Sequence, residues 1–411
     1  MDAYTALALG IALKSTQKRK RRKWAQQWYL CRERFGHVPL LNELRISEPD
    51  VFKNFLRMDG ESFDKLLDLV RPYITKENTV MRSAISPFER LSITLRFLAT
   101  GNTFEDLKFL SAISPQAIGG IVIDTCNAIN TCLQSYIKMP QTAEEWKELS
   151  NDFNKHWNIP HCIGALDGKH VSIKKPIGSG SFYYNYKKHC SIVLLAVVNA
   201  KYEFIMVDAG MNRRVSDGGV MSHTKFGSLM EHGELQLPGA EPLHEGDSID
   251  VPYFFVADDA FAMNENLLKP YSVMGNDVLD QERRVFNYRL SRGRRIVENV
   301  FGILVSRFGV FQRPMLLSPE KATTVTLTCC YLHNFLRKQS SGYMAPGSVD
   351  WEDNVTHELH SGEWRSKQRE LAALRPIFSR NSSEKAKFTR DTMKHYFSTL
   401  GSVPWQLKMV S

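Results

Sequence analysis

The sequence predicts a mixed α/β domain over residues 158–340, preceded by an all-helical region over residues 35–157. Two observations support this prediction. Between residues 162 and 257, short runs of β-branched and other apolar residues follow one another closely, as the strands of one sheet do. Residues 50–135 instead show apolar residues at helical spacing, and capping residues stand in front of them.

The helical region contains three well-marked patterns. SFDKLLDLVRPYI (62–74) has an apolar face, and we expect Pro72 to end that helix. In SPFERLSITLRFLAT (86–100), Ser86 is placed to cap the helix and Gly101 follows its last residue. Residues 103–133 divide at Ser114-Pro115 into a short and a longer helix. This spacing is typical of a helix-turn-helix unit that contacts DNA, but also of packing corners in helical bundles, and both interpretations stay open.

Five strand-like runs define the α/β region. They are CIGALDG (162–168), VSIKK (171–175), SIVLLAVVNA (191–200), EFIMVDAG (203–210) and PYFFVA (252–257). The run at 191–200 is almost wholly apolar, which predicts a central position in the sheet. Helical patterns at 291–308 and 320–338 follow the strands. Residues 341–368 are polar and acidic, so we expect a solvated linker there and a C-terminal helical tail over residues 369–411.

The net charge of +9 is concentrated at the N-terminus. Residues 1–34 hold nine Lys or Arg against two acids, a net of +7, and form a basic arm. Such a run is a nuclear import signal or a nucleic-acid arm, or else a solvated tail with neither role. No apolar run approaches the roughly 18–20 residues of a membrane span. Seven scattered cysteines without a CxxC pair argue against a disulfide framework or a structural zinc site.

Three acidic positions stand where an ordinary core would exclude them. Asp167 and the pair Asp258–Asp259 end apolar strands, and Glu298 lies among apolar residues of a helical pattern. Buried carboxylates are costly unless they are paired or bind a cation. Three that converge would hold two Mg²⁺ or Mn²⁺ ions, with Asp167 as the shared ligand, and drive phosphoryl chemistry. Taken singly, each has a plainer interpretation as a turn cap or an arginine partner.

Basic residues surround two of these positions. Residues 283–307 hold seven arginines and one acid, Glu298, a local net charge of +6. Because the guanidinium fork matches phosphate oxygens, this pattern suits a polyanionic substrate. The alternative is a helix held by Arg–Glu ion pairs. The candidate DNA contacts are Lys169, His170, Lys174, Lys175, Arg292, Arg294 and Arg295.

Over residues 86–340 the sequence resembles the PIF/Harbinger transposases and the domesticated nuclease derived from them. The stretches that carry the resemblance include IGALDGKHVSIKKP, FYYNYKKHCSIVLLAVVNA, YFFVADDAF, FNYRLSRGRRIVENVFGILVSRFGVF and CCYLHNFL. The resemblance implies an RNase H-like catalytic domain, a mixed sheet flanked by helices, with a DDE triad. The triad falls on Asp167, Asp258 and Glu298, which are the implied catalytic residues and metal ligands.

The resemblance leaves two further acids as additional candidates. Asp259 follows the second triad position, and the residue before that position is Ala257 instead of the usual glycine. Asp217 matches a family acid after a loop that here reads Met211-Asn212-Arg213 instead of Pro-Gly.

The function implied is that of a nuclear DNA transposase that cuts and joins phosphodiester bonds at terminal inverted repeats and inserts into AT-rich targets. The alternative is a domesticated nuclease, or a DNA-binding regulatory protein without strand transfer. Similar proteins work with a separately encoded Myb/SANT-like DNA-binding partner. A homodimer is expected because transposition holds two DNA ends together.

Overall fold

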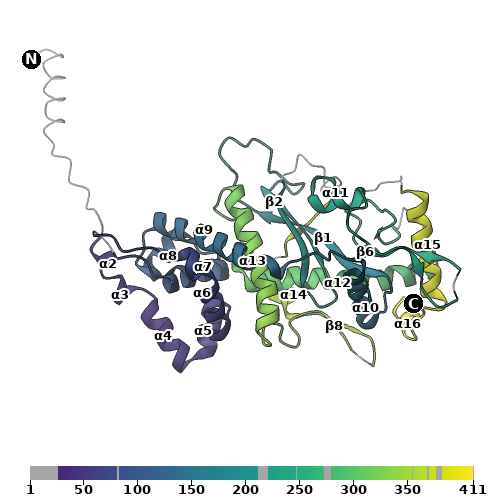
Figure 1. Cartoon of the computed structure of the whole chain (residues 1–411), viewed down its shortest axis with the longest axis horizontal. Helices are drawn as coiled ribbons and strands as arrows, with labels where there is room; N and C mark the ends of the chain where they lie inside the picture. The colour runs from purple at the N-terminus through teal and green to yellow at the C-terminus, as the bar shows by residue number, and fades with distance from the viewer. Residues whose placement is uncertain are drawn as a thin grey trace, which may run out of the picture.

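The computed structural model describes residues 26–80, 83–211, 221–246, 248–272, 279–353, 355–367, 370–375 and 382–410. Most of the basic arm and Asp217 lie outside these residues. Figure 1 shows an elongated molecule in which helices α2 to α9 form one end and an α/β region the other, with α13 between them.

Local capping chemistry sets the helix ends in the N-terminal region. In α7 (Pro87–Thr100), Ser86 and Glu89 form a reciprocal capping box, and Gly101 ends the helix in the left-handed conformation with φ of 64°. The expectation that Pro72 ends its helix was wrong, because α6 (Gly60–Ile74) continues past it. A proline in the last turn removes only one backbone hydrogen bond. The helices before α6 are α2 (Gln27–Leu30), α3 (Arg32–Phe35), α4 (Val38–Ser47) and α5 (Pro49–Leu56).

The two helices with helix-turn-helix spacing are α8 (Phe104–Ser111) and α9 (Pro115–Cys132), which meet at 97°. α9 packs against α6, α7 and α13, contains no Lys or Arg, and exposes Asp124. A helix without positive charge has nothing to neutralise phosphates, which favours the packing interpretation. In the described part of the chain no single helix is long and apolar enough to cross a membrane. Only the bent pair α8 and α9 passes that test, by length and composition.

Six of the described strands form one mixed sheet in the order β3-β2-β1-β6-β7, with β10 paired to β1, and the other four form two separate two-stranded sheets. β1, β2 and β3 are antiparallel neighbours, whereas β6 runs parallel to β1 and β7 parallel to β6. All eight residues of β2 are buried, as its apolar sequence predicts. The bounds are β1 (Cys162–Ser172), β2 (Ser191–Val198), β3 (Phe204–Met211), β6 (Phe254–Val256), β7 (Leu267–Leu268) and β10 (Ala372–Ala373).

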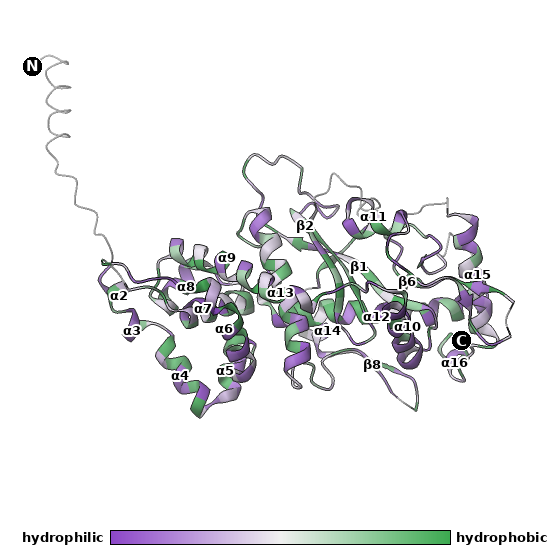
Figure 2. Ribbon diagram, viewed as in Figure 1, coloured by the Kyte–Doolittle hydropathy of each residue, from purple (hydrophilic) through white to green (hydrophobic). Residues whose placement is uncertain are grey.

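Helices cover both faces of this sheet, and the strands between them are hydrophobic (Figure 2). α12 (Gln281–Arg307) and α13 (Pro319–Gln339) pack on one face. α10 (Ala143–Trp157) packs on β1 from the other side, where Trp146 meets Phe255 with ring centroids 5.6 Å apart. α10 therefore belongs to the α/β region, although the sequence placed it with the preceding helices.

Short elements fill the connections of the described chain. They are η1 (Gln134–Tyr136), η3 (Met221–His223), α11 (Lys225–Glu231), β4 (Glu241–Pro242), β5 (Asp250–Val251) and η4 (Gly309–Phe311). The C-terminal part contains β8 (Trp351–Glu352), β9 (Leu359–His360), α14 (Glu363–Lys367), α15 (Glu384–Ser398) and α16 (Gln406–Val410). All seven cysteines are free. α15 and α16 pack against α12, so the C-terminal tail is helical and belongs to the same globule.

The acidic segment 341–368 is docked on α12, and the expectation of a solvated linker was wrong. Glu352 on β8 accepts hydrogen bonds from Arg292 and Arg295, and all three side chains are buried or nearly so. Burial would raise the pKa of Glu352, but the hydrogen bonds and charges of the two arginines hold it below the ordinary value. The polar, acidic composition of the segment suggested a linker. Composition does not reveal that Arg292 and Arg295, elsewhere in the chain, are buried cations that need a carboxylate partner.

The same contacts correct the assignment of Arg292 and Arg295 as DNA contacts. Arg292 lies 2.9 Å and Arg295 2.7 Å from Glu352, and both guanidinium groups point into the protein. Of the two alternatives for the arginine-rich helix, the ion-pair interpretation therefore holds for these two residues.

Replacing Glu352 by Gln should lower the free energy of unfolding by about 3–5 kcal/mol, because two buried guanidinium groups lose their counter-charge. Urea denaturation of the full chain measures this. Glu358→Gln is the matched control, since Glu358 is exposed in the same hairpin and its loss should change the unfolding free energy by no more than about 0.5 kcal/mol. Equal effects in the two variants would contradict the proposed role of the buried pairs.

Candidate active site

Asp167 and Asp258 come from the neighbouring strands β1 and β6. The expectation that Asp167 ends its strand was wrong, because β1 continues to Ser172, whereas Asp258 does follow the end of β6. β6 runs parallel to β1 with Val256 opposite Ala165, so the two acids, each two residues further on, are level with each other and point to the same face. Asp167 is 3% exposed, and Asp258 begins the loop after β6, where its carboxylate accepts a hydrogen bond from the backbone N–H of Ala260. The register therefore places Asp258, and not its neighbour, beside Asp167.

Lys169 brings the third acid into the same group. It lies on the same face of β1 as Asp167, and its Nζ is 2.7 Å from the Oδ2 of that residue. Burial alone would lower the pKa of Lys169, but the negative charges of Asp167, Glu298 and Asp258 together raise it. α12 packs on this face of the sheet and contributes Glu298. All three predicted acids thus act on one ammonium group.

The negative charge of Asp167, Asp258 and Glu298 is only partly balanced by nearby positive charges. Burial raises the pKa of Asp258 to about 6, with a further contribution from the neighbouring Asp167 carboxylate. Arg294 and Lys169 oppose this shift. Arg294 also pairs with Glu298 at 3.3 Å, one helical turn away. A carboxyl group that keeps its proton to higher pH indicates a site where another positive charge would be stabilising.

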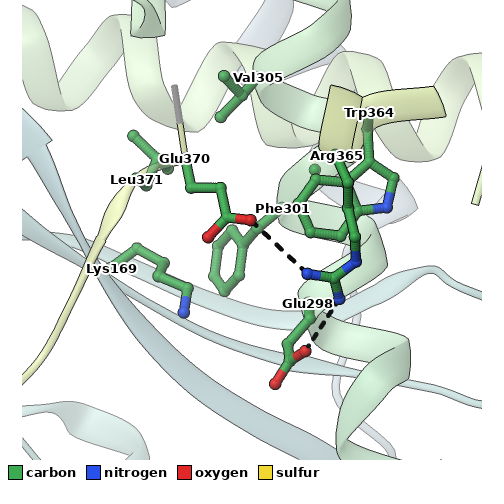
Figure 3. A pocket seen from close by; sticks show the side chains of 9 residues that line it. Lys169, Glu298, Phe301, Val305, Trp364, Arg365, Glu370 and Leu371 are labelled. Carbon is green, nitrogen blue, oxygen red and sulfur yellow. Dashed lines mark hydrogen bonds and ion pairs between the residues drawn. The ribbon is translucent and has the colours of Figure 1, made fainter. Parts of the chain in front are cut away.

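Residues from the C-terminal part of the chain form one wall of a pocket that Lys169 and Glu298 also line. This pocket of about 190 Å³ is lined by Lys169, Glu298, Phe301, Gly302, Val305, Trp364, Arg365, Glu370 and Leu371. Figure 3 shows the guanidinium of Arg365 between Glu298 and Glu370, at 3.5 Å and 3.6 Å. Asp350, whose side chain is fully buried, fixes Arg365 through Oδ1 and Oδ2. Arg365 therefore orients Glu298, and no pattern in the sequence indicated this contact.

The structure separates the other candidate residues from this cluster. The Oδ1 of Asp259 is buried, and no hydrogen-bond donor among the described residues reaches it. His170 points to the other face of β1 and is 3% exposed, so its assignment as a DNA contact is not supported. Lys174 and Lys175 are exposed on the loop after β1 and stay available to a polyanion.

The donor set fits a hard divalent cation. Carboxylate oxygens are the ligands that Mg²⁺ and Mn²⁺ prefer, and the three acids already act together on the Lys169 cation. Among the described residues, however, no three His, Cys, Asp or Glu side chains lie close enough to ligate one ion in their present positions. Binding of one ion by all three acids would therefore require these side chains to move closer together.

Part of the chain is similar to known proteins. Residues 166–334 match the family model described as DDE superfamily endonuclease. Protein ALP1-like of Arabidopsis thaliana is 23% identical over 333 residues, which cover 79% of this chain and 78% of that protein. The HARBI1 protein of Homo sapiens, whose name describes it as a nuclease, is 24% identical over 254 residues, 61% of this chain and 67% of that protein. No solved structure matches the chain.

Lys169→Met tests whether the acids bind a cation without relying on catalysis. In EDTA the variant should lose about 3–5 kcal/mol of unfolding free energy, because the buried Asp167 is left without a partner. Added Mg²⁺ should stabilise the variant more than the wild type, because the ion no longer competes with Lys169. Thermal denaturation with and without Mg²⁺ measures both effects, and Lys174→Met is the exposed control. An identical Mg²⁺ effect in variant and wild type would argue against a cation site at Asp167.

The raised pKa of Asp258 predicts a pH dependence of stability without metal. The folded protein holds this proton up to about pH 6, whereas the ordinary pKa of the group is 3.8. Between these values the folded state binds more protons, so stability should fall as pH rises. Asp258→Asn should remove this part of the slope in urea denaturation from pH 4 to 7 in EDTA, and the exposed Asp68→Asn should not. A slope unchanged by Asp258→Asn would contradict the assignment.

Proposed function

We propose that this chain, whose residues 166–334 match the DDE superfamily endonuclease model and which is similar to the ALP1-like and HARBI1 proteins, is a metal-dependent DNA nuclease with an RNase H-like catalytic domain. The observation that supports this most directly is the convergence of Asp167, Asp258 and Glu298 on Lys169. Acids on three separate elements meet there, and a plain turn cap or ion pair does not require that arrangement.

The three acids would hold the divalent ions, two Mg²⁺ or Mn²⁺, with Asp167 shared between them. Bound ions supply an activated nucleophile, water or a 3′-hydroxyl, and stabilise the leaving oxygen. Asp167 is fixed by β1 and by its neighbours in the sheet, so it needs little reorganisation. Glu298 is held in direction by Arg294 and Arg365.

The basic residues of the site would then bind the substrate phosphate. Lys169 lines the pocket, and its ammonium group, which now pairs with Asp167, would be free to bind a phosphate if Asp167 held a metal ion. Arg294 lies on α12 one turn before Glu298, with a partly exposed side chain. Together they would contact the non-bridging oxygens of the scissile phosphodiester and orient it against the acids.

Strand transfer distinguishes the two forms of enzyme that this proposal includes. A transposase joins the cut end to AT-rich target DNA, whereas a domesticated nuclease only cuts. HARBI1 is named as a nuclease, which favours the second form for this chain. A DNA-binding regulatory protein without catalysis would not need three converging acids. We further propose a nuclear location, on the basis of the run KSTQKRKRRK (14–23).

The proposal also includes partners. The substrate would be double-stranded DNA with terminal inverted repeats, read with a separate Myb/SANT-like DNA-binding protein, and a homodimer would hold two ends. α9 carries no positive charge, which is consistent with base recognition being supplied by another chain.

Asp167→Asn, Asp258→Asn and Glu298→Gln should each lower Mg²⁺-dependent cleavage of duplex DNA by on the order of a hundredfold or more, because a metal ligand is lost. Nicking of supercoiled plasmid and cleavage of duplexes with candidate terminal repeats measure this, with EDTA as the metal-free control. Thermal denaturation and DNA binding in EDTA verify that the variants fold. Appearance of joined products identifies a transposase.

Asp259→Asn is the matched control for the second acid and should keep most of the activity. An inactive Asp259→Asn beside an active Asp258→Asn would move the second ligand to Asp259. Cleavage by all three triad variants at the wild-type rate would overturn the mechanism.

A further inference from the structure

The connection between β1 and β2, residues 174–190, has an unusual composition. It contains four lysines, four Phe or Tyr residues and no Asp or Glu. The lysines are Lys174, Lys175, Lys187 and Lys188, and the aromatic residues are Phe182, Tyr183, Tyr184 and Tyr186. Phe182 and Tyr186 are each 37% exposed although large apolar rings are normally covered. The loop projects beyond the sheet in Figure 1.

Internal hydrogen bonds give the loop a defined shape. The buried side chain of Asn185 accepts hydrogen bonds from the backbone N–H groups of Lys187 and His189. These bonds close a turn that contains Tyr186. Its Nδ2 donates to Ser191 Oγ at 3.2 Å, and that hydroxyl is 3.0 Å from His170 Nδ1. These hydrogen bonds link the turn that carries Tyr186 to the buried His170 side chain of β1.

Two lysine ammonium groups lie over tyrosine rings of the loop. The Nζ of Lys175 lies 5.2 Å from the ring centre of Tyr184, and the Nζ of Lys187 lies 5.6 Å from that of Tyr186. Rings that offer a face for stacking, interleaved with cations that neutralise phosphates, are the usual surface for unpaired nucleotides. Bases in an intact duplex are stacked on each other and cannot use such rings.

The loop starts close to the candidate acids. It leaves β1 after Ser172, five residues beyond Asp167, which corresponds to roughly 17 Å along an extended strand. DNA that reaches the acids would therefore have its neighbouring nucleotides within reach of the loop.

We propose that the 174–190 loop binds unpaired bases of the DNA strand next to the scissile phosphate. Phe182 and Tyr186 stack on the bases, and the lysines hold the flanking phosphates. This inference rests on the proposed nuclease function and adds a substrate feature to it, since a strand end opened from the duplex would be bound in preference to a closed one. An acidic protein segment is the competing occupant, and it would use the lysines without needing exposed ring faces.

The test is equilibrium binding of the full chain in EDTA, which separates binding from cleavage. The probes are a fluorescent (dT)12 oligonucleotide and a blunt duplex of 20 base pairs. The double variant Phe182→Ala/Tyr186→Ala should bind (dT)12 at least about thirtyfold more weakly, because each lost stacking contact weakens binding by roughly five- to hundredfold. It should bind the duplex less than about twofold more weakly. Ile177→Ala, a fully exposed apolar residue of the same loop, should bind both probes as the wild type does, and Tyr186→Phe should retain (dT)12 binding.

Three outcomes would overturn the inference. These are unchanged (dT)12 binding by the double variant, equal losses on (dT)12 and duplex, or displacement of (dT)12 by a poly-glutamate peptide at the same concentration as by unlabelled (dT)12. Circular dichroism and thermal denaturation establish that the variants are folded. A wild type that discriminates (dT)12 through its rings but does not cleave DNA would refute the proposed nuclease and leave this binding site intact.

Discussion

The charge of Asp167 is the constraint on which the rest of the site depends. This carboxylate lies in the middle of a sheet and is almost wholly buried, so it is stable only with a cation beside it. Lys169 supplies that cation from two residues along the same strand. Asp258 and Glu298 then add negative charge that one ammonium cannot fully balance, as the raised pKa of Asp258 indicates. This imbalance of charge is the observation on which the proposed exchange of Lys169 for metal ions rests.

The sequence revealed the acids because each one breaks a local apolar pattern. Helix caps were equally predictable, since Ser86 and Glu89 are three residues apart and act within one turn. The choice between Asp258 and Asp259 was different, because it depends on the register of β6 against β1, and only the paired strands specify it. The arginine-rich helix was partly misread for the same reason. Arg292 and Arg295 face Glu352, which is 57 or more residues away in the sequence, and no local pattern predicts that contact.

The C-terminal segment shows how a remote region enters a site. Glu352 anchors it to α12, and Trp364 lies so close to Gly302 that a Cβ at that position would be 2.2 Å from the indole ring. This close approach brings Arg365 to Glu298. The family match ends at residue 334, so this wall of the pocket lies beyond the matched part. Residues of this segment can therefore affect the acids although they belong to none of the motifs.

Strand β1 has two roles because its side chains alternate between the faces of the sheet. Asp167 and Lys169 face α12, where Glu298 meets them, whereas His170 faces the other side and reaches Ser191 and, through it, Asn185. A shift of one residue in the pairing of β1 with β2 would exchange these faces and would separate both groups from their partners. The antiparallel ladder from Ala165–Val198 to Ser172–Ser191 prevents such a shift. The same ladder therefore holds Asp167 and Lys169 on the face towards α12, and His170 on the face from which it contacts the aromatic loop through Ser191.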